Sequence, residues 1–177
     1  MFQAQTSPMT FDTFITFALQ PENIARNFEF INGEVVEKRP LSSGNLDITN
    51  NLVSETRQHC EVTELPCYIS TSDGPYRIGS NIFSPDFAYK TMPLTNVHPD
   101  SPLWIAEVIS PHDNIIETSR RRRKYIEANI LYWELYPDEG LIDVYAPGKP
   151  LKTYGIHDAI IVNVILGLTL PVSKLFR

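Results

Sequence analysis

The sequence predicts a mixed α/β (α+β) fold, in which a central mixed sheet is flanked by helices and preceded by an N-terminal β-hairpin. Three observations support this prediction. Asn32-Gly33 separates two short alternating runs, which is the strongest short signal for a hairpin. Segments with helical periodicity at 46–61 and 114–129 stand among strongly β-prone runs. Strands and helices do not alternate strictly along the chain, and this order favours a mixed sheet.

The composition is that of an ordinary globular protein. The 177 residues are 42% apolar and 20% charged, and we expect residues 1–177 to form one domain. The net charge of −6 argues against a surface that binds nucleic acid over its whole extent. It leaves room for a local basic site, and the run at 120–124 is a candidate.

The sequence also lacks signals for export or for a membrane. The first six residues have no basic start and lead into no long apolar segment, so we expect no secretory signal. The apolar stretch at 159–170 is interrupted by polar residues and is too short to span a bilayer. Cys60 and Cys67 form neither a disulfide framework nor a zinc-binding spacing. These features predict a cytoplasmic protein with no membrane partner.

The first half of the chain contains two helices around the hairpin. Thr10 is placed to cap a short helix, and the hairpin follows over 28–36, because both positions of an Asn-Gly turn tolerate positive φ. The amphipathic pattern at 46–61 predicts the second helix, with Asn45 as a possible cap. Shorter strands are expected at 62–65, 67–70, 76–78 and 81–83.

The second half is organised around the apolar strand at 103–109. A strand at 85–90, with Asp86 at its start, and a proline-rich loop at 91–102 precede it. Either Ser110 or Asp113 can cap the helix that follows at 114–129. Further strands are expected at 131–136, 141–145 and 160–166, before a short closing turn or helix at 171–176.

Glu107 is the main local conflict in this sequence, because it stands among six apolar residues of a strand that should be buried. Ionised carboxylates are rarely buried unless they are paired or bound to a metal. Asp86 lies 21 residues upstream at the start of another strand, so the two carboxylates can converge at one end of the sheet. Two such oxygen ligands suit Mg²⁺ or Mn²⁺, with the carbonyl of Val108 as a third candidate.

An ordinary ion pair is the alternative interpretation. Glu107 could pair with Arg121 or Arg122 and hold the helix on the sheet without any metal. Consecutive helical residues step by about 100°, so the basic run at 120–124 covers the whole helix circumference, and at least one of its cations must face the sheet. Arg121 could form a surface pair with Glu117, or it could stabilise phosphate charge beside the acids.

Several of these motifs together resemble the Uma-two family of restriction-endonuclease-like nucleases, which have the PD-(D/E)xK type of fold. The resemblance rests on Pro85-Asp86, on 105–111, on the helix that leads to Tyr125, and on Tyr132-Trp133. The hairpin and the segment at 170–176 also fit, so the likeness covers nearly the whole chain. It implies a hydrolase that uses Mg²⁺ or Mn²⁺ to cut phosphodiester bonds in DNA.

The resemblance assigns roles to particular residues. Asp86 and Glu107 would be the metal-binding acids, and either Glu29 or Glu34 on the hairpin could supply a further acidic group. The lysine expected two residues after Glu107 is absent, since that position is Ile109.

The helix that follows Glu107 also departs from the family pattern. Members of the family take the lysine from this helix, whereas here Arg121 stands at that position, with Lys124 one turn further on. An arginine stays protonated, so it can stabilise phosphate charge but cannot act as a general base. Asn45 stands where the family commonly has a histidine.

Two functional hypotheses follow. In the first, the protein is a Mg²⁺-dependent DNA endonuclease in which Asp86 and Glu107 hold the metal, and Arg121 or Lys124 stabilises the developing charge. In the second, it is a catalytically degenerate member of the fold that serves as a binding or assembly module. The missing lysine favours the second hypothesis, and the retention of both acids favours the first. By analogy with restriction-like enzymes that cut two strands, the fold makes a homodimer a further expectation.

Overall fold

The computed structural model describes residues 9–38, 41–72, 74–93 and 101–177. The start of the chain and most of the proline-rich loop expected at 91–102 therefore lie outside the described residues. The helices are α1 (Phe11–Ala18), α2 (Ser43–Thr63), α3 (Ile115–Glu127) and the 3₁₀ helix η1 (Val172–Lys174). The strands are β1 (Phe28–Ile31), β2 (Glu34–Glu37), β3 (Tyr68–Thr71), β4 (Tyr76–Ile78), β5 (Asn81–Phe83), β6 (Phe87–Lys90), β7 (Trp104–Val108), β8 (Leu131–Tyr136), β9 (Leu141–Tyr145), β10 (Lys152–Gly155), β11 (Ala159–Ile161) and β12 (Thr169–Pro171).

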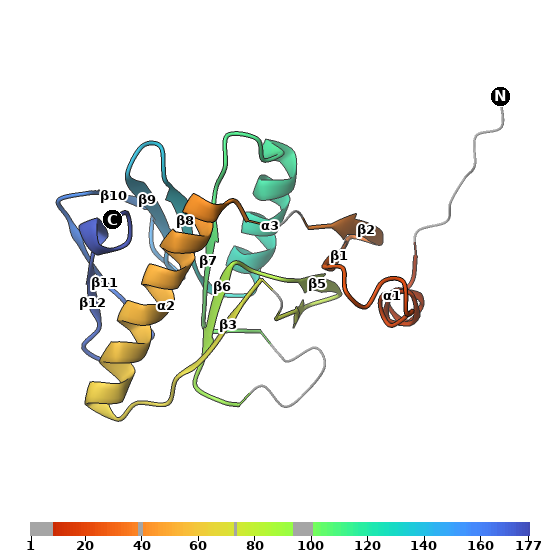
Figure 1. The fold of residues 1–177 in the computed structure, drawn as a ribbon, viewed down its shortest axis with the longest axis horizontal. Helices are drawn as coiled ribbons and strands as arrows, with labels where there is room; N and C mark the ends of the chain where they lie inside the picture. Colours follow the sequence, from red (N-terminus) through yellow and green to blue (C-terminus); the bar gives the residue numbers. More distant parts are fainter. Residues whose placement is uncertain (1–8, 39–40, 73, 94–100) are drawn as a thin grey trace.

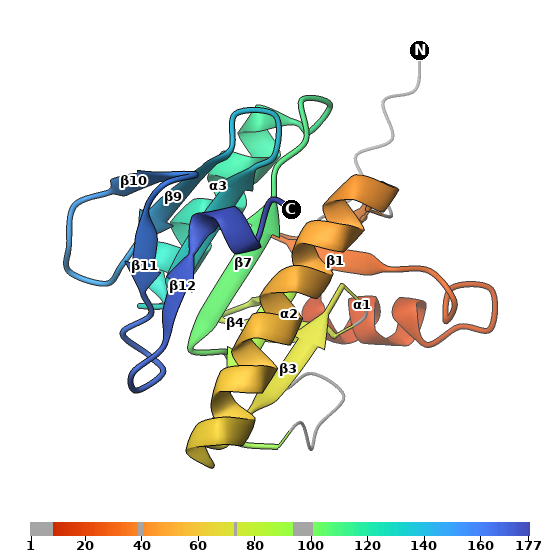
Figure 2. The ribbon, with the colours of Figure 1, turned by 60° about the vertical axis from the view of Figure 1, so that its left-hand side comes forward.

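A six-stranded mixed sheet forms the centre of the molecule, with strand order β10-β9-β8-β7-β6-β3. The β7–β8 pair is parallel, and its neighbours on both sides are antiparallel. Helix α2 covers one face of this sheet together with the C-terminal segment, and α3 covers the other face (Figures 1 and 2). A second, four-stranded sheet with order β2-β1-β5-β4 carries the hairpin. The prediction of a mixed sheet flanked by helices is confirmed.

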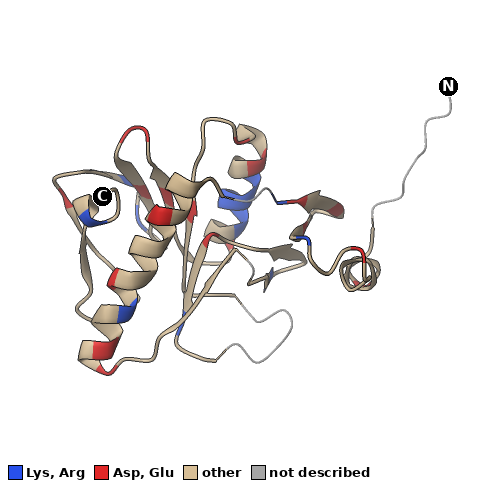
Figure 3. Ribbon diagram, in the orientation of Figure 1, with Lys and Arg blue, Asp and Glu red and all other residues tan. Residues whose placement is uncertain are grey.

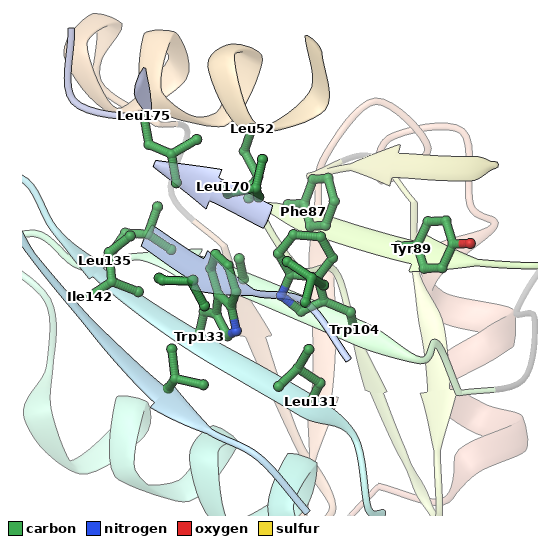
Figure 4. Close-up of a cluster of buried hydrophobic side chains, with 14 of the residues drawn as sticks. Leu52, Phe87, Tyr89, Trp104, Leu131, Trp133, Leu135, Ile142, Leu170 and Leu175 are labelled. Carbon is green, nitrogen blue, oxygen red and sulfur yellow. The ribbon is translucent and has the colours of Figure 1, made fainter. Parts of the chain in front are cut away.

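The alternation of side chains along β7 explains why its sequence is apolar throughout. Trp104, Ala106 and Val108 join the core cluster on the α2 side, which also contains Leu52 and Trp133. Figure 4 shows this cluster beneath α2, with the indole rings of Trp104 and Trp133 side by side. Ile105 points to the opposite face and joins the cluster around α3. Because both faces are covered, every residue of β7 is buried, including Glu107.

The hairpin forms as predicted. Asn32 and Gly33 both have positive φ, at 52° and 86°, as a tight two-residue turn between twisted strands requires. Strand β1 pairs with β5 through Phe30 and Ile82, which ties the hairpin to β4 and β5. Helix α1 packs on this sheet with the ring of Phe14 stacked 5.1 Å from that of Phe30. Thr10 caps α1 as predicted, because its hydroxyl accepts the N–H of Thr13.

Two predicted boundaries of α2 are wrong. The helix is capped by Ser42, whose hydroxyl accepts the N–H of Asn45, so Asn45 lies inside the first turn. At the other end, the helix continues to Thr63 and stops where Glu64 takes φ 54°. The strand predicted at 62–65 therefore does not form, because the helical hydrogen bonds satisfy this backbone.

Helix α3 and the C-terminal strands also depart from prediction. The cap of α3 is Asn114, whose Oδ1 accepts the N–H groups of Ile116 and Glu117, rather than Ser110 or Asp113. The strand predicted at 160–166 is limited to β11, because the chain turns back after it. Gly167 has φ 73°, and the N–H of Val162 donates to the carbonyl of Leu168. Strand β10 is an element that the sequence pattern did not predict.

Glu134 fixes α3 to the sheet. Its side chain on β8 is fully buried, and both its oxygens accept hydrogen bonds from Arg122 of α3, at 2.9 and 2.8 Å. Three further bonds come from the hydroxyl groups of Tyr132, Tyr136 and Tyr145. Burial and the charge of Glu134 raise the pKa of Tyr145 to about 12, so this phenol remains a donor. The basic band on α3 is visible in Figure 3.

We expect Arg122→Met to destabilise the fold by about 2–4 kcal/mol, because the carboxylate of Glu134 would remain buried without its main counter-charge. Arg123→Met is the matched control, since Arg123 lies on the same helix but is exposed, and this variant should change stability by less than about 0.5 kcal/mol. Urea denaturation of both variants measures the difference. Equal stability of the two variants would contradict this role for Arg122.

Candidate active site

The pairing of β6 with β7 brings Asp86 and Glu107 together. Phe87 lies opposite Ala106 in this antiparallel pair, so Asp86, one residue earlier, lies beside Glu107 on the face that α3 covers. The N–H of Asp86 donates to Oε2 of Glu107 at 3.3 Å. Oδ2 of Asp86 accepts the N–H of Val108 at 3.0 Å. The expected convergence of the two carboxylates is thus present at one end of the sheet.

Lys38 lies between these carboxylates, and the sequence pattern did not predict its presence there. Its ammonium is 2.8 Å from Oδ1 of Asp86 and 3.2 Å from Oε2 of Glu107, and it donates to the carbonyl of Ser84 at 2.5 Å. Lys38 follows directly after β2, at the end of the hairpin. One sequence signal could have pointed to Lys38. The chain has no lysine at positions 109 and 121, where the family pattern expects one, but it has a lysine at the end of the hairpin.

The charges in this group shift one another's pKa values. Burial raises the pKa of Glu107 to about 7, although the charge of Lys38 lowers it, and the charge of Asp86 raises it further. For Lys38, burial alone would lower the pKa, but the charges of Glu107 and Asp86 outweigh burial and raise it. Burial and the charge of Glu107 raise the pKa of Tyr125 well above its usual value, so its hydroxyl donates to Oε1 of Glu107 at 3.1 Å.

Arg121 and Glu29 form a second buried pair next to this one. Nε and Nη2 of Arg121 donate to Oε2 of Glu29, at 3.0 and 2.6 Å, and the N–H of Ser84 donates to Oε1. Glu29 on β1 is completely buried, whereas Glu34 on β2 is exposed and its carboxylate lies 3.8 Å from the guanidinium of Arg120. Of the two hairpin acids considered, Glu29 is therefore the one next to the site.

The other predicted cations lie elsewhere. Lys124 pairs with Glu127 on the surface of α3, at 2.9 Å, and Arg122 pairs with Glu134. The alternative in which Glu107 pairs directly with Arg121 or Arg122 is wrong for the described residues, because both arginines bind other acids. A surface pair between Glu117 and Arg121 is likewise absent among them. Arg121 and Arg122 both turn towards the sheet, which confirms that the run at 120–124 cannot be wholly solvated.

A cleft of about 480 Å³ opens over Asp86 and Glu107. Asn45 and Arg121 are among its lining residues, and so is His112, to which the sequence assigned no role. Lys124 does not line it. The charged lining groups are the carboxylates Glu37, Asp86, Glu107, Asp113 and Glu117, and the cations Lys38 and Arg121. An excess of carboxylates repels phosphate, so a polyanionic substrate would need additional positive charge in this cleft.

The donor set fits a hard divalent cation. Asp86 and Glu107 already direct one oxygen each at a single positive group, the ammonium of Lys38. The described residues contain no group of three or more His, Cys, Asp or Glu side chains arranged to hold a metal. Two carboxylates, with backbone carbonyls, waters and substrate oxygens completing the shell, are typical of Mg²⁺ sites. Asp86 and Glu107 could therefore hold Mg²⁺ or Mn²⁺, and the backbone carbonyl of Val108 is the candidate for a third ligand.

The architecture matches that of a solved structure over nearly its whole length. A crystal structure from Anabaena variabilis ATCC 29413, described as "a putative nuclease belonging to DUF820", superposes with a TM-score of 0.79. The match covers 96% of this chain and 98% of that chain at 19% sequence identity, so it shows a common fold. This confirms the restriction-endonuclease-like fold expected from the sequence.

The family is given by a sequence comparison. The family model described as "Uma2: Putative restriction endonuclease" matches residues 12–173. The chain belongs to this family, as the resemblance indicated. Comparison with curated proteins gives no match. Across the part of the chain that the structure describes, no helix has the length and apolar character needed to cross a membrane.

We expect Glu107→Gln to stabilise the fold, and to do so more at pH 8 than at pH 5. Well below pH 4.5 the carboxyl group is neutral in both the folded and unfolded states; between about pH 4.5 and pH 7 it is ionised mainly in the unfolded state, and above about pH 7 its charge is also present, and buried, in the folded state. Burying the Glu107 charge therefore costs more folding free energy as the pH rises. The gain in the free energy of unfolding from the neutral amide of Glu107→Gln should be about 1–3 kcal/mol larger at pH 8 than at pH 5.

Thermal melts at the two pH values measure this difference. Glu127→Gln, which changes an exposed carboxylate of α3, is the control and should alter stability little at either pH. A large loss of stability in Glu107→Gln at pH 8 would contradict this account, because it would mean that Glu107 acts as an essential structural counter-charge.

Proposed function

We propose that this protein is a Mg²⁺- or Mn²⁺-dependent DNA endonuclease that hydrolyses phosphodiester bonds. The observation that carries the proposal is the convergence of Asp86 and Glu107 on one cationic group at the base of the cleft. Two buried acids that share a single lysine are costly for a purely structural role. The family description, which names restriction endonucleases, supports DNA as the substrate.

Asp86 and Glu107 would hold the divalent ion. When bound, that ion would supply an activated water and polarise the scissile phosphate. The protein keeps both carboxylates oriented: Val108 and Ser72 donate to Asp86, and Tyr125 donates to Glu107. Both carboxylates line the cleft, so their remaining lone pairs are available to a ligand there.

Lys38 would supply the lysine that is missing from positions 109 and 121. Its side chain lines the cleft, so the ammonium can stay beside the metal-bound acids and hold positive charge next to the reacting phosphate. Arg121 would have a positioning role, since its planar group is held by Glu29 at the wall of the cleft. Lys124, bonded to Glu127 on the surface, has no place in this arrangement.

The wider assignments follow from the same proposal. We propose that residues 1–177 act as one unit in the cytoplasm, and that a homodimer would allow both strands of a duplex to be cut. Each cleft carries one set of the acids, so one copy would cut one strand.

Cleavage of supercoiled plasmid with Mg²⁺ or Mn²⁺ tests the proposal. We expect wild type to nick the plasmid only when a divalent ion is present. Glu107→Gln should lower the rate at least about 100-fold, because it removes one of two carboxylate ligands. Glu127→Gln removes the same charge from the surface of α3 and should retain full activity.

A folded wild-type protein that cuts with none of these ions would contradict the proposal and would favour the catalytically degenerate binding module. Cleavage that survives in Glu107→Gln would contradict the role of Glu107 and point to a contaminating nuclease or another site.

A further inference from the structure

We propose that Lys38 is a built-in counter-ion that occupies the cation position between Asp86 and Glu107 and must be displaced before a divalent metal binds there. The inference rests on the proposed function, since it concerns how the same site takes up its metal. It assigns to Lys38 a control over metal affinity that is separate from any role in bond cleavage.

The donors of Lys38 match the acceptors around it. An ammonium group has three N–H donors. In Lys38 they meet three oxygens: Oδ1 of Asp86, Oε2 of Glu107 and the carbonyl of Ser84, at 2.8, 3.2 and 2.5 Å. Only 10% of the Lys38 side chain is exposed. A divalent ion held by the same two carboxylates would have to take the position that this ammonium fills.

Lys38 can also leave this position at little structural cost. It follows β2, which is an edge strand of the four-stranded sheet, so its movement disturbs no central strand. Its backbone stays anchored, because its N–H donates to the carbonyl of Asn27 at 2.8 Å. The side chain lines the cleft and has a flexible four-carbon stem ending in a strongly hydrated charge. Release into the cleft therefore requires only rotation of the side chain and gives the ammonium water or phosphate as a new partner.

The neighbouring pair behaves differently. Arg121 holds Glu29 by two hydrogen bonds to one oxygen, and its planar group has a fixed geometry. Glu29 also has its other oxygen bound to the N–H of Ser84. We therefore expect the Arg121–Glu29 pair to stay intact when a metal binds. The contacts of Lys38 with Asp86 and Glu107 are the ones that a metal can replace.

Isothermal titration with MnCl₂ of wild type, Lys38→Met and Lys174→Met tests the inference. Methionine keeps most of the length of the side chain but removes its charge. We expect Lys38→Met to bind Mn²⁺ at least about tenfold more tightly than wild type, which corresponds to about 1.4 kcal/mol. Lys174→Met makes the same change in net charge at a surface pair with Glu55 on α2, and should bind as wild type does.

Equal or weaker binding by Lys38→Met, with measurable binding by wild type, would overturn the inference and leave the proposed metal site standing. If neither wild type nor Lys38→Met binds Mn²⁺, both the inference about Lys38 and the proposed metal site are overturned. An equal gain in Lys174→Met would also overturn it, because the effect would then come from net charge.

If Lys38→Met does not fold, wild type gives the answer by NMR. The ¹³Cε resonance of Lys38 should shift on titration with Mg²⁺ and saturate with metal binding, while that of Lys174 stays in place. A Lys38 resonance that does not move while Mg²⁺ binds would overturn the inference.

Discussion

A row of carboxylates crosses the central sheet, and the arrangement of the surrounding elements depends on how that row is neutralised. On the face that α3 covers lie Asp86, which directly precedes β6, and one acid each from β7, β8 and β9; in order these are Glu107, Glu134 and Asp143. Charges of one sign repel strongly when they are buried together, so the three buried acids of the row, Asp86, Glu107 and Glu134, need cationic partners. Those cations come from the end of the hairpin and from α3: Lys38 for Asp86 and Glu107, and Arg122 for Glu134. Asp143 is only partly buried, and its Oδ1 accepts a hydrogen bond from the hydroxyl of Thr153 on β10.

The same row separates structural acids from acids suited to chemistry. Glu134 accepts five hydrogen bonds from one arginine and three tyrosines, which leaves no capacity for a further ligand. Asp86 and Glu107 share one lysine, face a cleft, and have environments that raise the pKa of Glu107 to about 7. The two kinds of acid lie on neighbouring strands, with Glu107 directly opposite Glu134. The difference between them lies in their hydrogen-bond partners.

The features that were predictable from sequence are those encoded locally. The Asn32-Gly33 turn specifies its own backbone conformation, and a glutamate inside an apolar strand signals a buried charge without any knowledge of the fold. Pairing of Asp86 with Glu107 followed from two strands joined by one loop. The contact of Lys38 with Glu107 was not predictable in this way. The two residues are 69 positions apart in the sequence, and the strands on or next to which they lie belong to different sheets. Helix boundaries failed where more than one polar residue could serve as the cap, as with Asp113 and Asn114 before α3.

We propose that Asp86 and Glu107 form a single cation site that Lys38 and a divalent metal occupy in turn. Anomalous diffraction from crystals soaked in Mn²⁺ would locate the metal and the lysine together. We expect one manganese peak between the carboxylates of Asp86 and Glu107, with the ammonium of Lys38 moved into the cleft. A manganese peak elsewhere, with Lys38 still bonded to both acids, would contradict it.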